Sequence, residues 1–239
     1  MTETDTIATA AAATPATEEA TDLAALAELT AQRSAVYRLL ARLYRVEVDE
    51  EFLAELKTMR FPAATGNTAV DTGYRTIATY LSGADAHAIT DLAVDYVRAF
   101  IGHGIDAYSA AYPFESVYTS PDGLMMQEAY TQVRTLYHAA RFAKDPAFPE
   151  PEDHLAVELA FMARLCEQAA GALRAGEGQA AEDLLGGQLA FLRDHLLRWI
   201  EPFAADACAS AETGFYAHLA TFTETYLKAD ESALDEVVG

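Results

Sequence analysis

The chain of 239 residues carries 16 lysines and arginines against 37 aspartates and glutamates, which gives a formal net charge of −21. Such a surface repels nucleic-acid phosphates and anionic lipid, so the composition argues against both as partners and favours cationic ones. Hydrophobic residues make up 51% of the chain, enough for the core of one domain without a disulfide or metal.

The N-terminal region has no basic stretch followed by an apolar run, so the sequence predicts no signal peptide. No apolar stretch approaches the roughly 20 residues of a membrane span. The cysteines, Cys166 and Cys208, have no metal-ligand spacing, and Cys166 lies on an apolar helical stripe typical of a core residue. We therefore expect a cytoplasmic protein.

The first half of the chain predicts a short disordered segment followed by helices. Residues 1–20 are rich in Ala, Thr and Glu, and they have too little to bury to form a packed structure. Apolar residues at helical spacing then predict four helices. These run from the Thr21–Asp22 cap to about Leu43, from Glu50 to Met59 behind the cap Asp49, from Val70 to Leu81 before Gly83, and from Ile89 to Ile101 before Gly102.

The second half predicts four more helices, and no run shows the alternation of a strand. Ser120-Pro121-Asp122 combines a capping hydroxyl, a proline and an acid, which is typical of a helix start. The four helices run from there to about Phe142, from Pro151 through Leu173, from Leu185 to Trp199 before Pro202, and through Phe215 to Tyr226. The sequence therefore predicts an all-α, single-domain bundle of about eight to ten helices over residues 21–239.

Glu150-Pro151-Glu152-Asp153-His154 is the most notable polar segment. If Pro151 opens a helix, Asp153 points nearly opposite to the apolar stripe of that helix. His154 and Glu158 are then one turn apart and can pair. A plain helix start explains the proline and the acids, but it does not explain a histidine at the positive end of the helix dipole.

Tyr112-Pro113-Phe114-Glu115-Ser116-Val117-Tyr118 is a second candidate, because it places three aromatic rings and an acid in a predicted loop over residues 103–119. Such rings either pack into the core or form a recognition surface for apolar groups. The segment lies just ahead of a predicted helix start, as a recognition loop often does.

Catalytic and metal motifs are missing from the sequence. It contains no HExxH, no paired Glu-x-x-His, no GxSxG and no phosphate-binding glycine pattern, so we expect neither an enzyme nor a metal or other cofactor. Two other classes remain open. One is an enzyme that uses Asp153, His154 and Glu158 for acid/base catalysis, and the other is a structural or assembly subunit without a peptide ligand.

Three runs together resemble the TorD/DmsD/NarJ group of redox-enzyme maturation chaperones. These are Glu115 to Gln127, Glu150 to Met162, and Gln188 to Trp199, which contains a Phe-x-x-x-His-x-x-x-Trp pattern. The resemblance spans about Ala31 to Leu227. It implies an all-helical cytoplasmic chaperone that binds the twin-arginine leader of a molybdenum-cofactor oxidoreductase subunit, assists cofactor insertion and proofreads before Tat export. The client enzyme, and the choice between monomer and homodimer, stay open.

The resemblance also implies where the leader binds. Some members have a tryptophan just before the Ser-Val-Tyr element, where this chain has Phe114. Arginine pairs bidentately with carboxylates, so we expect acidic side chains of both segments to receive the arginines and the aromatic rings to contact the apolar stretch. The predicted peptide-binding residues are Phe114, Glu115, Ser116, Tyr118, Glu150, Pro151, Glu152, Asp153, His154 and Glu158.

Overall fold

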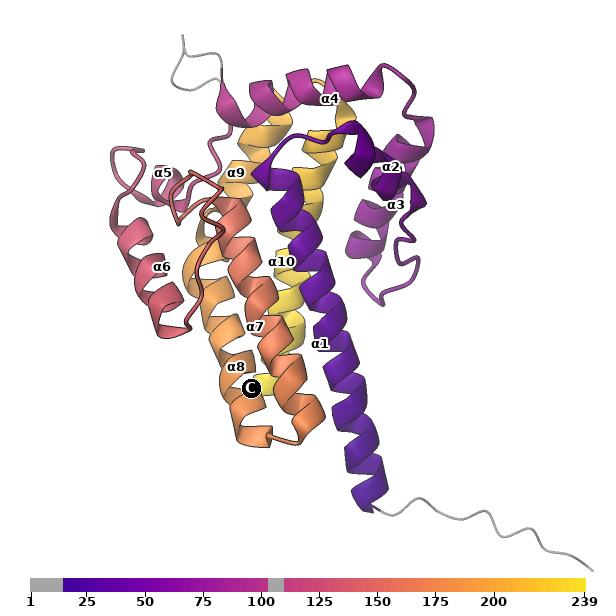
Figure 1. Cartoon of the computed structure of the whole chain (residues 1–239), viewed down its shortest axis with the longest axis vertical. Coiled ribbons are helices and arrows are strands. Elements are labelled where there is room, and N and C mark those ends of the chain that lie inside the picture. Colours follow the sequence, from indigo (N-terminus) through magenta and orange to yellow (C-terminus); the bar gives the residue numbers. More distant parts are fainter. Residues whose placement is uncertain (1–14, 103–109) are drawn as a thin grey trace, which may run out of the picture.

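The computed structural model describes residues 15–102 and 110–239, and this part of the chain is all-helical (Figure 1). The N-terminal helices are α1 (Pro15–Arg45), α2 (Glu50–Thr58), α3 (Thr68–Gly83) and α4 (Ala88–Tyr96), and α4 continues into the π-helical segment η1 (Val97–Ile101). The remaining helices are α5 (Glu115–Thr119), α6 (Glu128–Ala139), α7 (Leu155–Ala175), α8 (Gly178–Phe191), η2 (Leu192–Leu196, π-helical), α9 (Leu197–Ser210) and α10 (Gly214–Val238).

The described residues thus form nine continuous helices, because α4 runs into η1 and α8 runs through η2 into α9. This confirms the predicted all-α class and number of helices. Helices α1, α7, α8 and α10 form the long axis of the bundle, α1 packs closely along α7, and α5 and α6 lie to one side (Figure 1). None of the helices in this part of the chain has the length and apolar content needed to cross a membrane.

The core is rich in aromatic side chains where the C-terminal end of α1, η1 and α9 meet. Trp199, Phe203 and Tyr44 are fully buried, and Phe203 packs against both other rings with centroids 5.4 and 5.7 Å away. Phe100 of η1 stacks on Phe203 at 6.0 Å. The π-helical segment is therefore anchored in the core.

Several helix boundaries agree with the sequence. Asp49 caps α2 as predicted, since its side chain accepts a hydrogen bond from the backbone of Phe52 at 2.8 Å. Gly102 ends η1 with φ +81, a backbone conformation that glycine adopts without strain. The first helix, however, begins at Pro15 rather than at Thr21. Of the predicted disordered segment 1–20, residues 1–14 lie outside the described residues, as do residues 103–109 of the predicted loop.

Two other boundary predictions are wrong. Ser120-Pro121-Asp122 forms a turn, not a helix start; Gly123 with φ +62 follows, and α6 begins only at Glu128. The helix that was expected to stop before Pro202 instead continues to Ser210. Proline removes one hydrogen bond to the carbonyl four residues earlier, here that of Arg198. Both residues are exposed, so water can hydrate the freed carbonyl.

Candidate functional site

The two segments that the sequence singles out lie side by side in the structure. Phe114 and His154 form an isolated antiparallel bridge. On either side of it, the amide of Glu115 donates to the carbonyl of Asp153 at 2.9 Å, and the amide of Leu155 donates to the carbonyl of Pro113 at 2.8 Å. Backbone hydrogen bonds therefore fix the start of α5 against the start of α7.

His154 is the N-cap of α7. Its Nδ1 accepts a hydrogen bond from the amide of Ala156 at 3.0 Å, which requires a neutral imidazole. Burial, together with the charge of Lys144, lowers the pKa of His154 to about 3. The rings of Phe114 and Phe148 meet the imidazole edge-on at 4.9 and 5.0 Å. The predicted pairing of His154 with Glu158 is therefore wrong, because the cap turns the imidazole onto its own backbone.

The predicted orientation of Asp153 is also wrong. Helix α7 begins at Leu155, and Pro151 belongs to the preceding turn, in which its carbonyl accepts from the amide of His154 at 3.2 Å. Asp153 lies before the helix, so the rotation of 100° per residue does not apply to it. The side chain is fully buried, and its Oδ2 accepts a hydrogen bond from the backbone of Ser116 at 3.2 Å.

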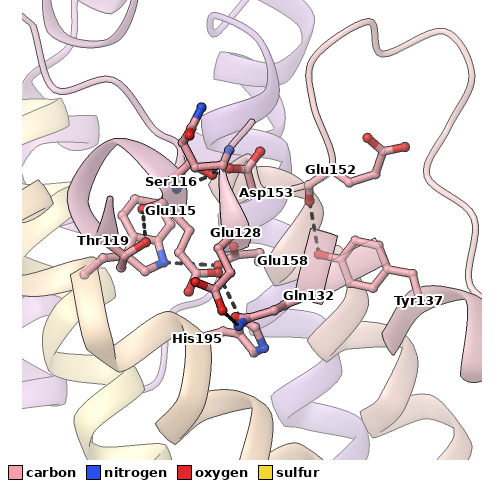
Figure 2. Close-up of polar contacts among 12 residues, drawn as sticks. Glu115, Ser116, Thr119, Glu128, Gln132, Tyr137, Glu152, Asp153, Glu158 and His195 are labelled. Carbon is pink, nitrogen blue, oxygen red and sulfur yellow. Dashed lines mark hydrogen bonds and ion pairs between the residues drawn. The ribbon is translucent and has the colours of Figure 1, made fainter. Parts of the chain in front are cut away.

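Asp153 belongs to a buried acid cluster formed with Glu115 and Glu158, all three with 0% exposure (Figure 2). His195 of η2 contacts Glu115 Oε2 through Nδ1 at 2.9 Å, and Trp199 donates from Nε1 to Glu158 Oε2 at 3.3 Å. The other carboxyl oxygen of each acid has no hydrogen-bond partner among the described residues. Neither Glu115 nor Asp153 can therefore meet an arginine unless the packed segments separate.

Burial shifts Glu158 and Asp153 toward their protonated forms. It raises the pKa of Glu158 well above its ordinary value, and the neighbouring carboxyl of Glu115 raises it further. It also raises the pKa of Asp153, although hydrogen bonds from Ser116 oppose that shift. Nowhere in residues 15–102 and 110–239 do three or more His, Cys, Asp or Glu side chains form a group that could hold a metal ion.

The bridged segments line a surface cleft of about 410 Å³. Phe100 and Ile101 of η1 and the end of α1 line the same cleft. Phe114, Glu150 and His154 are the three predicted site residues that line the cleft. The complete lining is Arg45, Val46, Glu47, Tyr96, Phe100, Ile101, Tyr112, Pro113, Phe114, Met125, Phe148, Glu150 and His154.

The cleft combines an apolar floor with acidic groups at its edge. Phe100 and Phe114 are buried, whereas Glu47 is exposed and Glu150 is half-buried. Within the described part of the chain, the carboxylates of Glu47 and Glu150 form no hydrogen bond or ion pair. The cation that lines the cleft, Arg45, pairs with Asp145 at 2.6 Å. Two carboxylates are therefore free to receive a cationic ligand.

The remaining predicted residues lie behind the cleft or beside it. Tyr118 stacks on Trp199 at 5.6 Å and donates to Asp206 at 3.1 Å, so its ring supports α5 rather than the cleft. Ser116 and Glu158 are fully buried. Pro151 and Glu152 are half-buried outside the cleft lining, and the carboxylate of Glu152 points away from the acid cluster (Figure 2).

Sequence reasoning missed three contributors: Glu47, the residues of η1, and His195. π-Helical turns are frequent at functional sites, and both such segments serve this region, η1 by lining the cleft and η2 by carrying His195. The Phe191-x-x-x-His195-x-x-x-Trp199 run is the sequence pattern that could have indicated His195 as a contributor to this region. It places Phe191 against the His195 ring at 4.9 Å and aims both polar rings, His195 and Trp199, at the acid cluster.

Comparisons with known proteins give a consistent result. The profile of the family described as "Nitrate reductase delta subunit" matches residues 65–205. "Chaperone protein TorD" of Shewanella sp. (strain MR-4) is 29% identical over 218 residues, which cover 86% of this chain and 95% of that protein. The protein of the same name from Vibrio cholerae (strain O395) is 31% identical over 151 residues, covering 62% of this chain and 64% of that protein.

Among solved structures, a putative redox enzyme maturation protein from Archaeoglobus fulgidus is 20% identical to this chain. The match covers 85% of this chain and 93% of that one, with a TM-score of 0.44.

Proposed function

The chain belongs to the nitrate reductase delta subunit family, as a TorD-like chaperone of redox-enzyme maturation, and we propose that its cleft binds the twin-arginine leader of the client subunit. The family consists of chaperones rather than enzymes, so acid/base catalysis is not assigned to Asp153, His154 and Glu158. We further propose that the client is a molybdenum-cofactor oxidoreductase subunit. The chaperone would act in the cytoplasm, before Tat export, and assist cofactor insertion and proofreading.

The observation that carries this proposal is the pairing of free carboxylates with an aromatic floor in one cleft. A guanidinium group binds a carboxylate bidentately and stacks on aromatic rings, which ammonium groups do less well. Glu47 and Glu150 supply the carboxylates, and Phe114 lies in the floor between them and the core. The net charge of −21 adds long-range attraction for a cationic peptide.

The buried residues of the two bridged segments have a supporting role in this proposal. Glu115, Ser116 and Asp153 hold the 112–116 backbone against α7, and the cleft wall exists only while that contact is formed. Phe114, Glu150 and His154 then present the surface that the leader contacts. In this assignment Glu150 meets an arginine, whereas the predicted acids Glu115 and Asp153 are buried and do not.

Isothermal titration calorimetry with a synthetic leader peptide tests the proposal. The peptide carries two consecutive arginines followed by an apolar stretch, and we expect Glu150→Gln to weaken binding by roughly five- to tenfold, as the loss of one partly buried charge pair. The matched control is Glu182→Gln, an exposed acid on α8, a helix that contributes no residue to the lining of the cleft. A peptide with two lysines in place of the arginines should bind more weakly to the unaltered protein.

The salt dependence of the same titrations gives a second readout. Affinity for the unaltered protein should fall as ionic strength rises, and the slope should be smaller for a Glu47→Gln/Glu150→Gln double variant, because fewer charge pairs are screened. If the double variant binds the leader as tightly as the unaltered protein, the cleft is not the leader site.

A further inference from the structure

Two adjacent methionines stand exposed at the mouth of the cleft. Met125 lines the cleft with 40% of its surface exposed, and Met126 beside it is 54% exposed. Leu124 precedes them at 55%, so three consecutive large apolar side chains face solvent. Exposed apolar patches of this kind mark surfaces that contact a partner, and methionine adapts its shape to different partners.

The loop that carries these methionines is held at both ends. Ser120 Oγ accepts from the amide of Leu124 at 3.2 Å, and Ser116 Oγ accepts from the amide of Gln127 at 3.0 Å. Gln127 also donates from its side chain to the carbonyl of Met125 at 2.9 Å. Met126 has φ +58, the left-handed region that non-glycine residues enter only when their surroundings impose it. The fixed backbone therefore holds both thioethers out of the core.

We propose that Met125 and Met126 are an oxidation site through which peroxides weaken binding of the apolar part of the leader; this inference rests on the proposed function. A sulfur lone pair attacks one oxygen of a hydroperoxide, an S–O bond forms and the O–O bond breaks. The sulfur loses two electrons and becomes a sulfoxide, while the other oxygen takes up a proton and leaves as water or an alcohol. The product is polar where the leader requires an apolar contact.

The other internal methionines serve as comparisons. Met162 of α7 is fully buried and therefore protected from peroxide, whereas Met59 is 38% exposed but lies by α2 and α3, away from the cleft. Oxidation of Met59 therefore adds the same mass as oxidation at the cleft mouth without changing the surface that the leader meets.

The experiment titrates the leader peptide into the full chain before and after hydrogen peroxide treatment, with peptide mapping by mass spectrometry to locate each added oxygen. A Cys208→Ser background removes the exposed thiol as a competing target. We expect oxygen on Met125 and Met126 and about tenfold weaker binding, which corresponds to ~1.4 kcal/mol. Methionine sulfoxide reductases should restore the affinity.

Two variants separate the possible outcomes. Met125→Leu/Met126→Leu keeps the apolar surface, so peroxide treatment should not change its affinity for the leader. Met59→Leu keeps both cleft methionines, so peroxide should weaken its binding as much as it weakens that of the unaltered protein. The inference is overturned if both cleft methionines are oxidised without loss of affinity, or if they resist oxidation. It is also overturned if peroxide weakens leader binding by the double leucine variant. If the untreated protein binds no leader, it is the proposed function that fails.

Discussion

Replacing Glu158 by glutamine tests whether the buried acid cluster lowers stability at neutral pH. Burial and Glu115 raise the pKa of Glu158 well above the value of 4.5 that this carboxyl has when it is free in solution. Between pH 4.5 and the higher pKa of the folded state, the folded chain binds more protons than the unfolded chain. The free energy of unfolding contributed by Glu158 therefore falls as pH rises.

The size of the effect follows from the contacts of the side chain. Glutamine can still accept the hydrogen bond of Trp199 Nε1 and can donate one to Glu115, but it carries no charge at any pH. Above about pH 4.5 the folded chain must either keep Glu158 protonated or bury its charge, and each tenfold difference in proton affinity between the folded and unfolded states costs about 1.4 kcal/mol. We therefore expect Glu158→Gln to stabilise the protein by about 1–4 kcal/mol at about pH 8, and to have little effect at about pH 4.

Urea unfolding followed by far-UV circular dichroism at a series of pH values measures this difference. His154 acts in the opposite direction: its pKa falls from 6.5 to about 3 on folding, so stability is lost as pH drops between those values. Subtracting the profiles of the variant and the unaltered protein removes that contribution. Glu182→Gln should give a flat difference. A Glu158→Gln protein that is less stable at about pH 8, or whose difference does not change with pH, would refute the reasoning.

Two further substitutions test the packing around the site. His195→Ala leaves Glu115 Oε2 without its partner and should lower the free energy of unfolding by about 2–3 kcal/mol. The control is the exposed His138→Ala, which should change the free energy of unfolding by less than about 0.5 kcal/mol. Equal effects of the two substitutions in urea unfolding would contradict this prediction. Gly73→Ala should cost about 1–3 kcal/mol, because a Cβ on Gly73 overlaps the ring of Phe222. The Cβ of Gly171→Ala meets open space within α7, so this variant should instead stabilise the protein by about 0.5–1 kcal/mol. If thermal unfolding ranks the two glycine variants in the other order, the α3–α10 packing is contradicted.

The helices were predictable where local chemistry alone decides them. Asp49 ahead of α2 and the apolar stripe from Phe215 to Tyr226 in α10 need no distant contact to specify a helix. Ser120-Pro121-Asp122 carries equally good local signals, yet it forms a turn. There the hydrogen bond that the amide of Gln127 donates to Ser116 Oγ, together with Gly123 at positive φ, imposes an irregular loop.

The side-chain directions of the candidate site could not be predicted because they depend on where α7 begins. A helix opening at Pro151 puts Asp153 on the solvent face, whereas one opening at Leu155 leaves it in a turn beneath α5. The sequence pattern also treats acids as surface residues, since carboxylates are rarely buried without partners. Glu115 and Glu158 depart from that rule through partners that come from η2 and α9, about 40 to 80 residues away along the chain.

The buried acids and the open cleft can be understood as two parts of one arrangement. The cluster ties α5 to α7, and η2 supplies the histidine that contacts Glu115. Among the described residues, one oxygen of each acid has no hydrogen-bond partner, so this arrangement is less stable than an apolar core of the same shape would be. A leader that binds only when the wall is formed adds a stabilisation that grows with its concentration, about 2.7 kcal/mol at one hundred times Kd. If the cleft binds the leader as proposed, this polar contact between α5 and α7 makes the order of the region sensitive to the peptide, which a tightly packed apolar contact would not.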